Sequence, residues 1–337
     1  MNVVVLFGGT SAERDVSIAS GIQVAKALRE NGHDVVAVDT ARGALSRGEE
    51  AQLLTGSVGQ HPPQTEALAM LKGSSPVLSR DGLLHRADVV FLALHGGTGE
   101  DGTVQAVLDL AGLPYSGSGH AASAVAMDKG ISKQLFRAAG IPTPDWVMAP
   151  ADPAVILARA GLPAVVKPNR QGSTIGLTVI RETADLAGAI ELAARYDDEV
   201  MIERFIPGRE LTVGILDGKA LPPGEIIPKL SDIFDYESKY QSGGAEEVFP
   251  ANLSPVETAH VQDLALRAHR ALKLGAYSRI DFRLDPAGVF WCLEANTLPG
   301  MTATSLLPQA ARAAGISFES LCETIIRLAV DSPRRPS

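Results

Sequence analysis

Continuous apolar runs alternate with helical periodicities along the first third of the chain. Val3–Phe7 and Asp88–Leu94 are almost entirely apolar, which is typical of parallel strands that are buried on both faces. After the first run, Asp15 can cap a helix that ends near residues 31–32, and the next strand is expected at Asp34–Val38. This β-α-β pattern predicts an α/β unit, in which ligands gather at the carboxyl ends of the strands.

The rest of the chain predicts shorter elements of mixed type. Residues 120–139 are expected to form two helices with a break near Lys129. The capping box Ser254-Pro255-Val256-Glu257 predicts a helix that Gly275 stops. Further strands are expected at 164–167, 177–180, 199–205, 278–284 and 289–295, and further helices at 103–111, 306–314 and 318–330.

A length of 337 residues suggests two or three lobes rather than one. From the elements we expect an N-terminal α/β unit at residues 1–119, a central α+β lobe at 120–211 and a C-terminal α+β lobe at 212–337. Residues 222–252 are weakly periodic and rich in glycine, proline and serine. Since a long irregular segment in a compact domain is usually functional or mobile, we expect a mobile loop at residues 236–244.

The strands expected at 278–284 and 289–295 form a hairpin, and their pairing decides which side chains meet. The turn Asp285-Pro286-Ala287-Gly288 joins them. The predicted register assumes that Asp285 pairs with Gly288, and a bulge would shift it. Under this assumption Leu284 faces Val289, Asp281 faces Cys292 and Arg279 faces Glu294.

Four polar residues of this hairpin share one face, because side chains alternate along a strand. They are Arg279 and Asp281 on the first strand and Glu294 and Asn296 on the second. Two carboxylates as diagonal neighbours, with an amide oxygen beside them, suit Mg²⁺, which takes one or two carboxylates together with waters and phosphate oxygens. A solvated sheet face with an Arg–Glu pair is the alternative.

Composition and charge narrow the function classes. The chain is 45% apolar and 20% charged, as in ordinary soluble globular proteins, and its net charge of −9 argues against nucleic acid or an anionic membrane as partner. Cys292 and Cys322 lack metal-ligand spacing and are expected to be buried free thiols in a reducing compartment. No signal peptide and no apolar run near membrane-spanning length is apparent. We therefore expect a cytoplasmic protein.

Other candidate residues follow strand ends or glycine loops. Glu13 lies in a loop after the first strand, and His95 ends a strand before four glycines. Lys167 ends a short strand before a glycine-containing loop at 168–176, whose backbone N–H groups could bind phosphates. As single residues, Glu13 could be a salt-bridge partner, His95 a capping group and Lys129 a solvated lysine, and the loop a flexible hairpin. No Walker A loop occurs, and the loop after the first strand, at residues 8–14, lacks the Gly-x-Gly-x-x-Gly spacing of the dehydrogenase fingerprint.

Taken together and in order, nine segments resemble the bacterial D-alanine–D-alanine ligases of the ATP-grasp fold. Each segment is weak alone, but they span nearly the whole chain; the departures are Asp15 and Thr174, where glutamate and serine are frequent. The segments are Phe7 to Arg14, His95 to Thr103, Met127-Asp128-Lys129, Val166-Lys167-Pro168, Gly172-Ser173, Ile202-Glu203, Tyr236 to Tyr240, Arg279-Ile280-Asp281 and Glu294 to Thr302.

The resemblance implies an ATP-grasp enzyme with a Rossmann-like N-terminal unit. It joins two molecules of D-alanine for peptidoglycan synthesis, uses ATP and two Mg²⁺ (or Mn²⁺) ions, and is commonly a homodimer. The first D-alanine would become an acyl phosphate, which the amine of the second would attack. For the nucleotide, it implies that Lys129, Lys167 and Lys239 bind the phosphates, and that Glu203, Arg204, Phe205, Ile206 and Glu210 seat adenosine.

The same resemblance assigns the amino-acid and metal sites. Asp281, Glu294 and Asn296 would hold the metal ions. It implies that the first alanine is bound by Glu13, Ser173 and Tyr240 and oriented by His95. Arg279 and the Gly300 N–H would stabilise the oxyanion of the tetrahedral intermediate. The carboxylate of the second alanine would be bound by Ser305 and Leu306.

The identity of residue 240 helps to predict the second substrate, which accepts the acyl group. Related ligases that join D-alanine to D-lactate carry histidine in this region, so a tyrosine favours an amine nucleophile and a dipeptide product. A D-alanine–D-lactate or D-alanine–D-serine ligase of the same fold is the first alternative. A nucleotide-binding protein without turnover is the second, and it would be marked by loss of a metal carboxylate or of Arg279.

Overall fold

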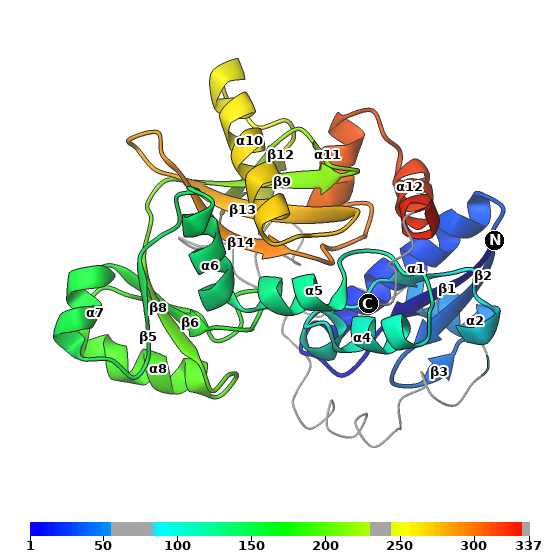
Figure 1. Ribbon diagram of the computed structural model, residues 1–337, viewed down its shortest axis with the longest axis horizontal. Helices are drawn as coiled ribbons and strands as arrows, with labels where there is room; N and C mark the ends of the chain where they lie inside the picture. Colours follow the sequence, from blue (N-terminus) through cyan, green and yellow to red (C-terminus); the bar gives the residue numbers. More distant parts are fainter. Residues whose placement is uncertain (55–81, 83, 230–243, 332–337) are drawn as a thin grey trace.

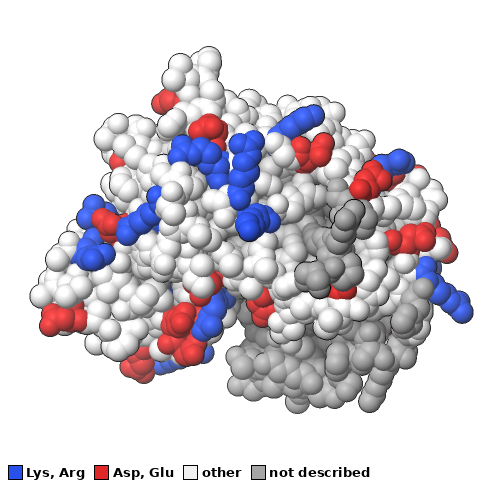
Figure 2. Space-filling view, in the orientation of Figure 1, with Lys and Arg blue, Asp and Glu red and all other residues white. Residues whose placement is uncertain are grey.

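The computed structural model describes residues 1–54, 82, 84–229 and 244–331. Among them, no helix combines the length and apolar character needed to cross a membrane. Cys292 and Cys322 are both buried free thiols, as expected. On the face shown in Figure 2, basic and acidic side chains are interspersed.

A parallel sheet with helices on its faces forms the N-terminal part. Its strand order is β3-β2-β1-β4, in which β1 pairs in parallel with β2 and β4, while the short β3 is antiparallel to β2. The apolar residues of β1 and β4 are buried, as the continuous runs predict. The elements are β1 (Asn2–Phe7), α1 (Arg14–Glu30), β2 (Asp34–Asp39), β3 (Gly43–Ala44), α2 (Arg47–Leu54), β4 (Val89–Leu92) and α4 (Thr103–Leu110).

The core of this sheet includes a helix from the far end of the sequence. Leu321, Cys322, Ile325 and Ile326 of α12 (Phe318–Asp331) belong to the same buried cluster as the residues of β1 and β4. Helix α12 contacts both α1 and β4, and Figure 1 shows it beside α1. The first and last helices of the described chain therefore pack as one layer.

Helix α1 begins two residues earlier than predicted. Glu13 is its N-cap residue, although its side chain makes no capping hydrogen bond, and Asp15 lies in the first turn. The prediction that Asp15 caps the helix is therefore wrong. Arg14 fixes this start, because its guanidinium is buried against Asp39 at the end of β2 and donates to the Gly9 carbonyl oxygen at 2.6 Å.

The central part is a small antiparallel sheet with its own apolar core. Its order is β5-β8-β6-β7, and helices α7 and α8 flank it in Figure 1. The break predicted near Lys129 is confirmed, since α5 ends at Met127 and the Asp128 side chain accepts from the N–H of Ile131 to cap α6. The elements are α5 (His120–Met127), α6 (Lys129–Ala138), β5 (Trp146–Met148), α7 (Pro153–Arg159), β6 (Ala164–Pro168), β7 (Thr178–Ile180), α8 (Leu186–Ala194) and β8 (Val200–Arg204).

A larger sheet of order β12-β11-β9-β13-β14, with β10 paired to β9, completes the fold. Helix α10 begins with the predicted capping box of Ser254 and Glu257. Strands β11 and β12, which lie in the described parts of residues 222–252, were not predicted from the sequence, and neither was β9. The elements are β9 (Arg209–Leu216), β10 (Lys219–Ala220), β11 (Gly224–Pro228), β12 (Ala245–Val248), α10 (Pro255–Ala271), β13 (Tyr277–Leu284), β14 (Phe290–Asn296) and α11 (Leu306–Ala313), with 3-10 helices at Leu84–Arg86, Gly97–Gly99 and Thr183–Asp185.

The predicted register of the β13–β14 hairpin is wrong. Asp281 pairs with Glu294 rather than Cys292, and Arg279 pairs with Asn296 rather than Glu294. The register shifts after Asp281, so that Leu293 is the extra residue of a bulge. The two carboxylates are therefore direct cross-strand neighbours rather than diagonal ones.

Candidate active site

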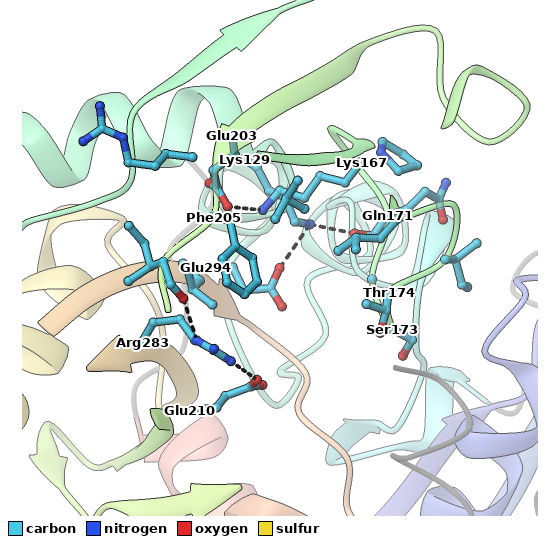
Figure 3. Close-up of a pocket in the computed structure, with 18 residues that line it drawn as sticks. Lys129, Lys167, Gln171, Ser173, Thr174, Glu203, Phe205, Glu210, Arg283 and Glu294 are labelled. Atoms are coloured by element: carbon cyan, nitrogen blue, oxygen red, sulfur yellow. Dashed lines mark hydrogen bonds and ion pairs between the residues drawn. The ribbon is translucent and has the colours of Figure 1, made fainter. Parts of the chain in front are cut away.

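Two adjoining cavities lie between the sheets. The first, of about 130 Å³, lies between the small sheet and the β13–β14 hairpin, and Figure 3 shows the side chains that line it. Phe205 and Ile175 contribute apolar surface, while four lysine and arginine side chains contribute positive charge. Its polar and charged lining residues include Lys129, Lys167, Gln171, Ser173, Thr174, Glu203, Arg204, Glu210, Arg283 and Glu294.

Glu203 is a buried carboxylate held between two lysines. Strand β8 places it in the wall of the first cavity, with a residue exposure of 3%. Lys167 donates to its Oε1 at 2.9 Å, and Lys133 donates to its Oε2 at 2.5 Å. Burial acts to raise the pKa of Glu203, but the two ammonium groups outweigh it and the pKa is lowered. The carboxylate is therefore ionised and fixed on both oxygens.

Lys129 and Glu294 meet at the boundary of the cavity. The Lys129 ammonium donates to the carbonyl oxygen of Gln171 at 2.6 Å and lies 3.2 Å from Glu294 Oε2. Figure 3 shows these contacts converging from α6, the 168–176 loop and β14. Because α6 starts at Lys129, the break between α5 and α6 places the Lys129 ammonium next to the 168–176 loop.

Arg283 organises the other end of the first cavity. Its Nη1 lies 3.2 Å from Glu210 Oε2, its Nε donates to the Ile206 carbonyl oxygen at 3.2 Å, and its guanidinium lies 5.7 Å from the centre of the Phe205 ring. Arg204 lines the cavity, but its Nη2 donates to the Arg159 carbonyl oxygen at 3.2 Å. The predicted adenosine residues thus lie around one space.

The second cavity, of about 360 Å³, opens beside the first. The two share Gly172, Ser173, Glu210, Leu293 and Glu294 as lining residues. A molecule in one cavity can therefore approach a molecule in the other at the boundary formed by these residues. Its other lining residues include Glu13, His95, Glu100, Arg279, Asp281, Asn296, Gly300, Ser305 and Leu306.

Glu13 and Ser173, 160 positions apart in sequence, form a hydrogen bond in which the Ser173 hydroxyl donates to Glu13 Oε1. Ser173 has a φ of 50°, in the left-handed region, so the loop itself turns the hydroxyl toward Glu13. Two glycines make room for the carboxylate, because a Cβ atom would lie 2.8 Å from Glu13 Oε2 at Gly96 and 3.0 Å from it at Gly172.

The pKa values of His95 and Glu100, which both line the second cavity, are shifted in opposite directions. Burial lowers the pKa of His95 to about 4, and its Nε2 lies 3.2 Å from the Ser20 hydroxyl. Burial and the neighbouring Glu13 raise the pKa of Glu100 to about 8, although its Oε2 accepts from the Gly96 N–H at 2.7 Å. At neutral pH the second cavity therefore holds a neutral imidazole and a protonated Glu100.

The Asp281 carboxylate accepts hydrogen bonds from Arg279, Thr212 and Asn296. Arg279 binds it with Nε and Nη2 at 2.9 and 2.8 Å, and Thr212 donates to Oδ1 at 2.7 Å. The Asn296 amide donates to Oδ2 at 2.9 Å. Two carboxylates with an amide side chain are the donor set of a hard divalent cation, so Asp281, Glu294 and Asn296 fit Mg²⁺ chemically. In this arrangement Arg279 and the Asn296 amide nitrogen would have to turn from Asp281 to admit the ion.

The 300–306 segment closes the second cavity. Ser305 is the N-cap residue of α11, and its hydroxyl oxygen accepts from the Thr302 N–H at 3.1 Å. A Cβ atom on Gly300 would lie 2.8 Å from the Ser305 hydroxyl, so a side chain there would displace it. Lys239 and Tyr240, predicted for the phosphates and the first substrate, lie outside the described residues.

Sequence reasoning did not single out Lys133, Glu100, Thr212 or Arg283. Glu100 was visible only as one letter of the glycine-rich segment, and a carboxylate beside four glycines could have marked it. Thr212 lies on the missed strand β9. Lys133 and Arg283 carried no local signal, since Glu203 and Glu210 are about 70 positions away from them.

Comparisons with known proteins identify the family to which the chain is similar. Residues 2–118 match the family model described as "D-ala D-ala ligase N-terminus", and residues 135–327 match "D-ala D-ala ligase C-terminus". A D-alanine–D-alanine ligase of Gloeobacter violaceus is 45% identical over 336 residues, covering 98% of this chain and all of that protein.

Solved structures give the same picture. A D-alanine–D-alanine ligase of Bacillus anthracis, complexed with ATP, is 33% identical with a TM-score of 0.76, covering 98% of each chain. The VanG D-Ala:D-Ser ligase of Enterococcus faecalis is 29% identical with a TM-score of 0.80, covering 97% of this chain and 99% of that one. The expected ATP-grasp fold is confirmed, and the chain belongs to the D-alanine–D-alanine ligase family.

Proposed function

We propose that this protein joins two molecules of D-alanine at the expense of ATP and makes the dipeptide used in cell-wall synthesis. The observation that carries the proposal is the pair of adjoining cavities. One offers an apolar slot with lysines, which suits a nucleotide, and the other offers paired carboxylates and an arginine, which suit amino acids. Glu294 and Ser173 line both, so the reacting groups would meet at that boundary.

In the nucleotide cavity, Phe205 and Ile206 pack against the base while Glu203 and the backbone of Arg204 face its polar edge. Glu210, which is held by Arg283, accepts from the ribose hydroxyls. Lys129 and Lys167, which line this cavity, turn their ammonium groups to the phosphates. By the sequence resemblance, Lys239 would add a third ammonium group. Phosphoryl transfer depends mainly on such positioning and charge neutralisation.

Bound divalent ions would be held by Asp281, Glu294 and Asn296, and they would neutralise charge on the phosphate oxygens. Glu13 accepts from the ammonium group of the first D-alanine, and Ser173 fixes Glu13 for that task. His95, neutral because of its burial, orients this substrate. The carboxylate of the first D-alanine attacks the γ-phosphorus of ATP, ADP leaves, and a D-alanyl phosphate remains.

The amine of the second D-alanine then attacks the acyl carbon, and phosphate leaves as the peptide bond forms. Arg279 and the Gly300 N–H stabilise the oxyanion of the tetrahedral intermediate. Ser305 and the start of α11 at Leu306 receive the second carboxylate, where the helix N-terminus favours an anion.

The acceptor is an amine in this proposal, supported by Tyr240 in the sequence and by D-alanine–D-alanine ligase relatives at 41–45% identity. D-Serine, which the name of the VanG enzyme specifies, is the second candidate acceptor. We also propose that the protein acts as a homodimer in the cytoplasm. Buried, unpaired Cys292 and Cys322 are consistent with a reducing compartment.

The test is ADP formation with ATP, Mg²⁺ and D-alanine, compared with L-alanine and with D-serine or D-lactate as acceptor. The proposal predicts rapid ADP release with D-alanine and a D-alanyl-D-alanine product identified by mass spectrometry. ATP binding without D-alanine-dependent ADP release would indicate a nucleotide-binding protein, and preferential D-lactate or D-serine incorporation would change the acceptor.

A further inference from the structure

Lys133 is a fully buried lysine that lies behind the wall of the first cavity rather than in it. Its side chain is 0% exposed, and it is absent from the residues lining that cavity. Its ammonium donates to the Thr143 hydroxyl at 2.7 Å and to Glu203 at 2.5 Å, and it lies 5.1 Å from the centre of the Trp146 ring. Burying an ammonium is costly unless it is paired and hydrogen-bonded, so this contact set holds a charge in place.

The Lys133 ammonium is connected through Glu203 to Lys167, which lines the first cavity. Lys133 binds one oxygen of the Glu203 carboxylate and Lys167 binds the other. Lys167 lines the first cavity, and Figure 3 shows its side chain and that of Glu203 reaching toward each other there. The three residues come from α6, β8 and β6, so the chain Lys133–Glu203–Lys167 crosses the wall from its buried side to its open side.

We propose that Lys133 is a positioning residue for the nucleotide, which acts through Glu203 and sets how Lys167 is presented to the phosphates. The inference rests on the proposed function, because it takes the first cavity to be the ATP site. With Lys133 in place, Glu203 shares its two carboxylate oxygens between two lysine ammonium groups, and the three residues together carry a net charge of +1.

Removal of Lys133 would change the net charge of the Lys133–Glu203–Lys167 trio and the hydrogen bonding of Glu203. Glu203 would keep Lys167 as its cation partner within the trio, and the net charge of the trio would fall to zero. Its freed oxygen can then also bind Lys167 and draw that ammonium away from the cavity, or Glu203 can take up a proton and lose the interaction. The first response moves positive charge away from the triphosphate, and the second leaves Lys167 charged but without the carboxylate that positions it. Neither response alters the second cavity, which is built from other residues.

The test compares Lys133→Met with Arg137→Met. Arg137 lies one turn further along α6, with its guanidinium 4.2 Å from the centre of the same Trp146 ring, but its ion pair is with the half-exposed Asp145. We expect Lys133→Met to raise KM for ATP and Kd for ADP about tenfold or more, the scale for loss of one partner of a buried charge pair. KM for D-alanine should stay within about twofold, and Arg137→Met should resemble the wild type.

If the Lys133→Met variant does not fold, Thr143→Val provides a second test of the proposal. That change keeps the lysine and removes the oxygen that holds its ammonium in line with Glu203, and a smaller rise in KM for ATP alone is expected. An unchanged KM for ATP in Lys133→Met, or in Thr143→Val if the methionine variant does not fold, overturns the inference. So does an equal rise for both substrates. Absence of D-alanine-dependent ADP release in the wild type would instead overturn the proposed function.

Discussion

Asp281 on β13 lies directly opposite Glu294 on β14, and the bulge at Leu293 makes them neighbours. Without the bulge, the register of Phe282 with Cys292 would continue, Glu294 would pair with Ile280, and its side chain would leave the face of Asp281. Both carboxylates line the second cavity, and Glu294 lines the first as well. The bulge therefore decides whether this hairpin can present two carboxylates to one cation.

Glu294→Gln should weaken the response to Mg²⁺. The change removes one of two carboxylates that face each other, and we expect about 10–100-fold more Mg²⁺ to be needed for half-maximal activity, the range seen when support of a metal site is lost. The measurement is ADP release against Mg²⁺ concentration. Glu246→Gln, an exposed carboxylate on β12, is the matched control and should follow the wild-type curve.

Arg279→Lys should lower kcat more than it raises KM. Lysine keeps the charge but loses the planar pair of donors that binds Asp281 through Nε and Nη2. Removing one oxyanion donor costs about 10²–10³ in kcat in other enzymes. Steady-state kinetics with D-alanine measures the effect, and Arg270→Lys on α10, which is exposed, is the control. A wild-type kcat in Arg279→Lys would contradict the role assigned to Arg279.

Glu13→Gln should raise KM for D-alanine and leave KM for ATP near its wild-type value. The amide cannot supply the negative charge that an ammonium group needs, and Ser173 loses its charged acceptor. Breaking a buried charge pair typically costs about 2–5 kcal/mol, so the rise should exceed about tenfold. A parallel rise for ATP would show that Glu13 supports the loop rather than the substrate.

Glu100→Gln should change how stability depends on pH. The pKa of Glu100 is raised from 4.5 to about 8 in the folded protein, because burial and Glu13 disfavour its charge. The folded state therefore binds a proton that the unfolded state releases, and wild-type stability falls as pH rises from 4.5 to about 8. Denaturant unfolding at several pH values should show this loss shrinking in Glu100→Gln. A difference between the two proteins that does not vary with pH would contradict it.

Much of the fold was predictable because its signals are local. The buried strands β1 and β4 are continuous apolar runs, the capping box of Ser254 marks α10, and the break before Lys129 follows from the cap at Asp128. Strand β9 was missed although Leu211–Leu216 is rich in aliphatic residues, since Pro207-Gly208 before it and Gly214 within it are typical of loops. Its centre position in the sheet, between β11 and β13, comes from tertiary pairing.

The site was predictable as a set of residues but not as a geometry. Most candidates line the two cavities, yet the Asp281–Glu294 pairing depends on a bulge that no local pattern marks. The raised pKa of Glu100 comes from burial and from Glu13, which is 87 positions away in the sequence and approaches Glu100 only in the fold. Lys133 looks like any helical lysine until β8 brings Glu203 to it. Such relationships are set by packing between distant segments.

The packing of α12 into the N-terminal sheet has a consequence for biosynthesis. Translation produces β1 and β4 more than 200 residues before residue 318, yet their apolar surface shares a buried cluster with Leu321, Ile325 and Ile326. A nascent chain that has not reached α12 thus exposes part of this surface to solvent and to chaperones. We expect ribosome-bound fragments ending before residue 318 to be cut by proteases within the first sheet, and protection there to arise only when α12 has emerged.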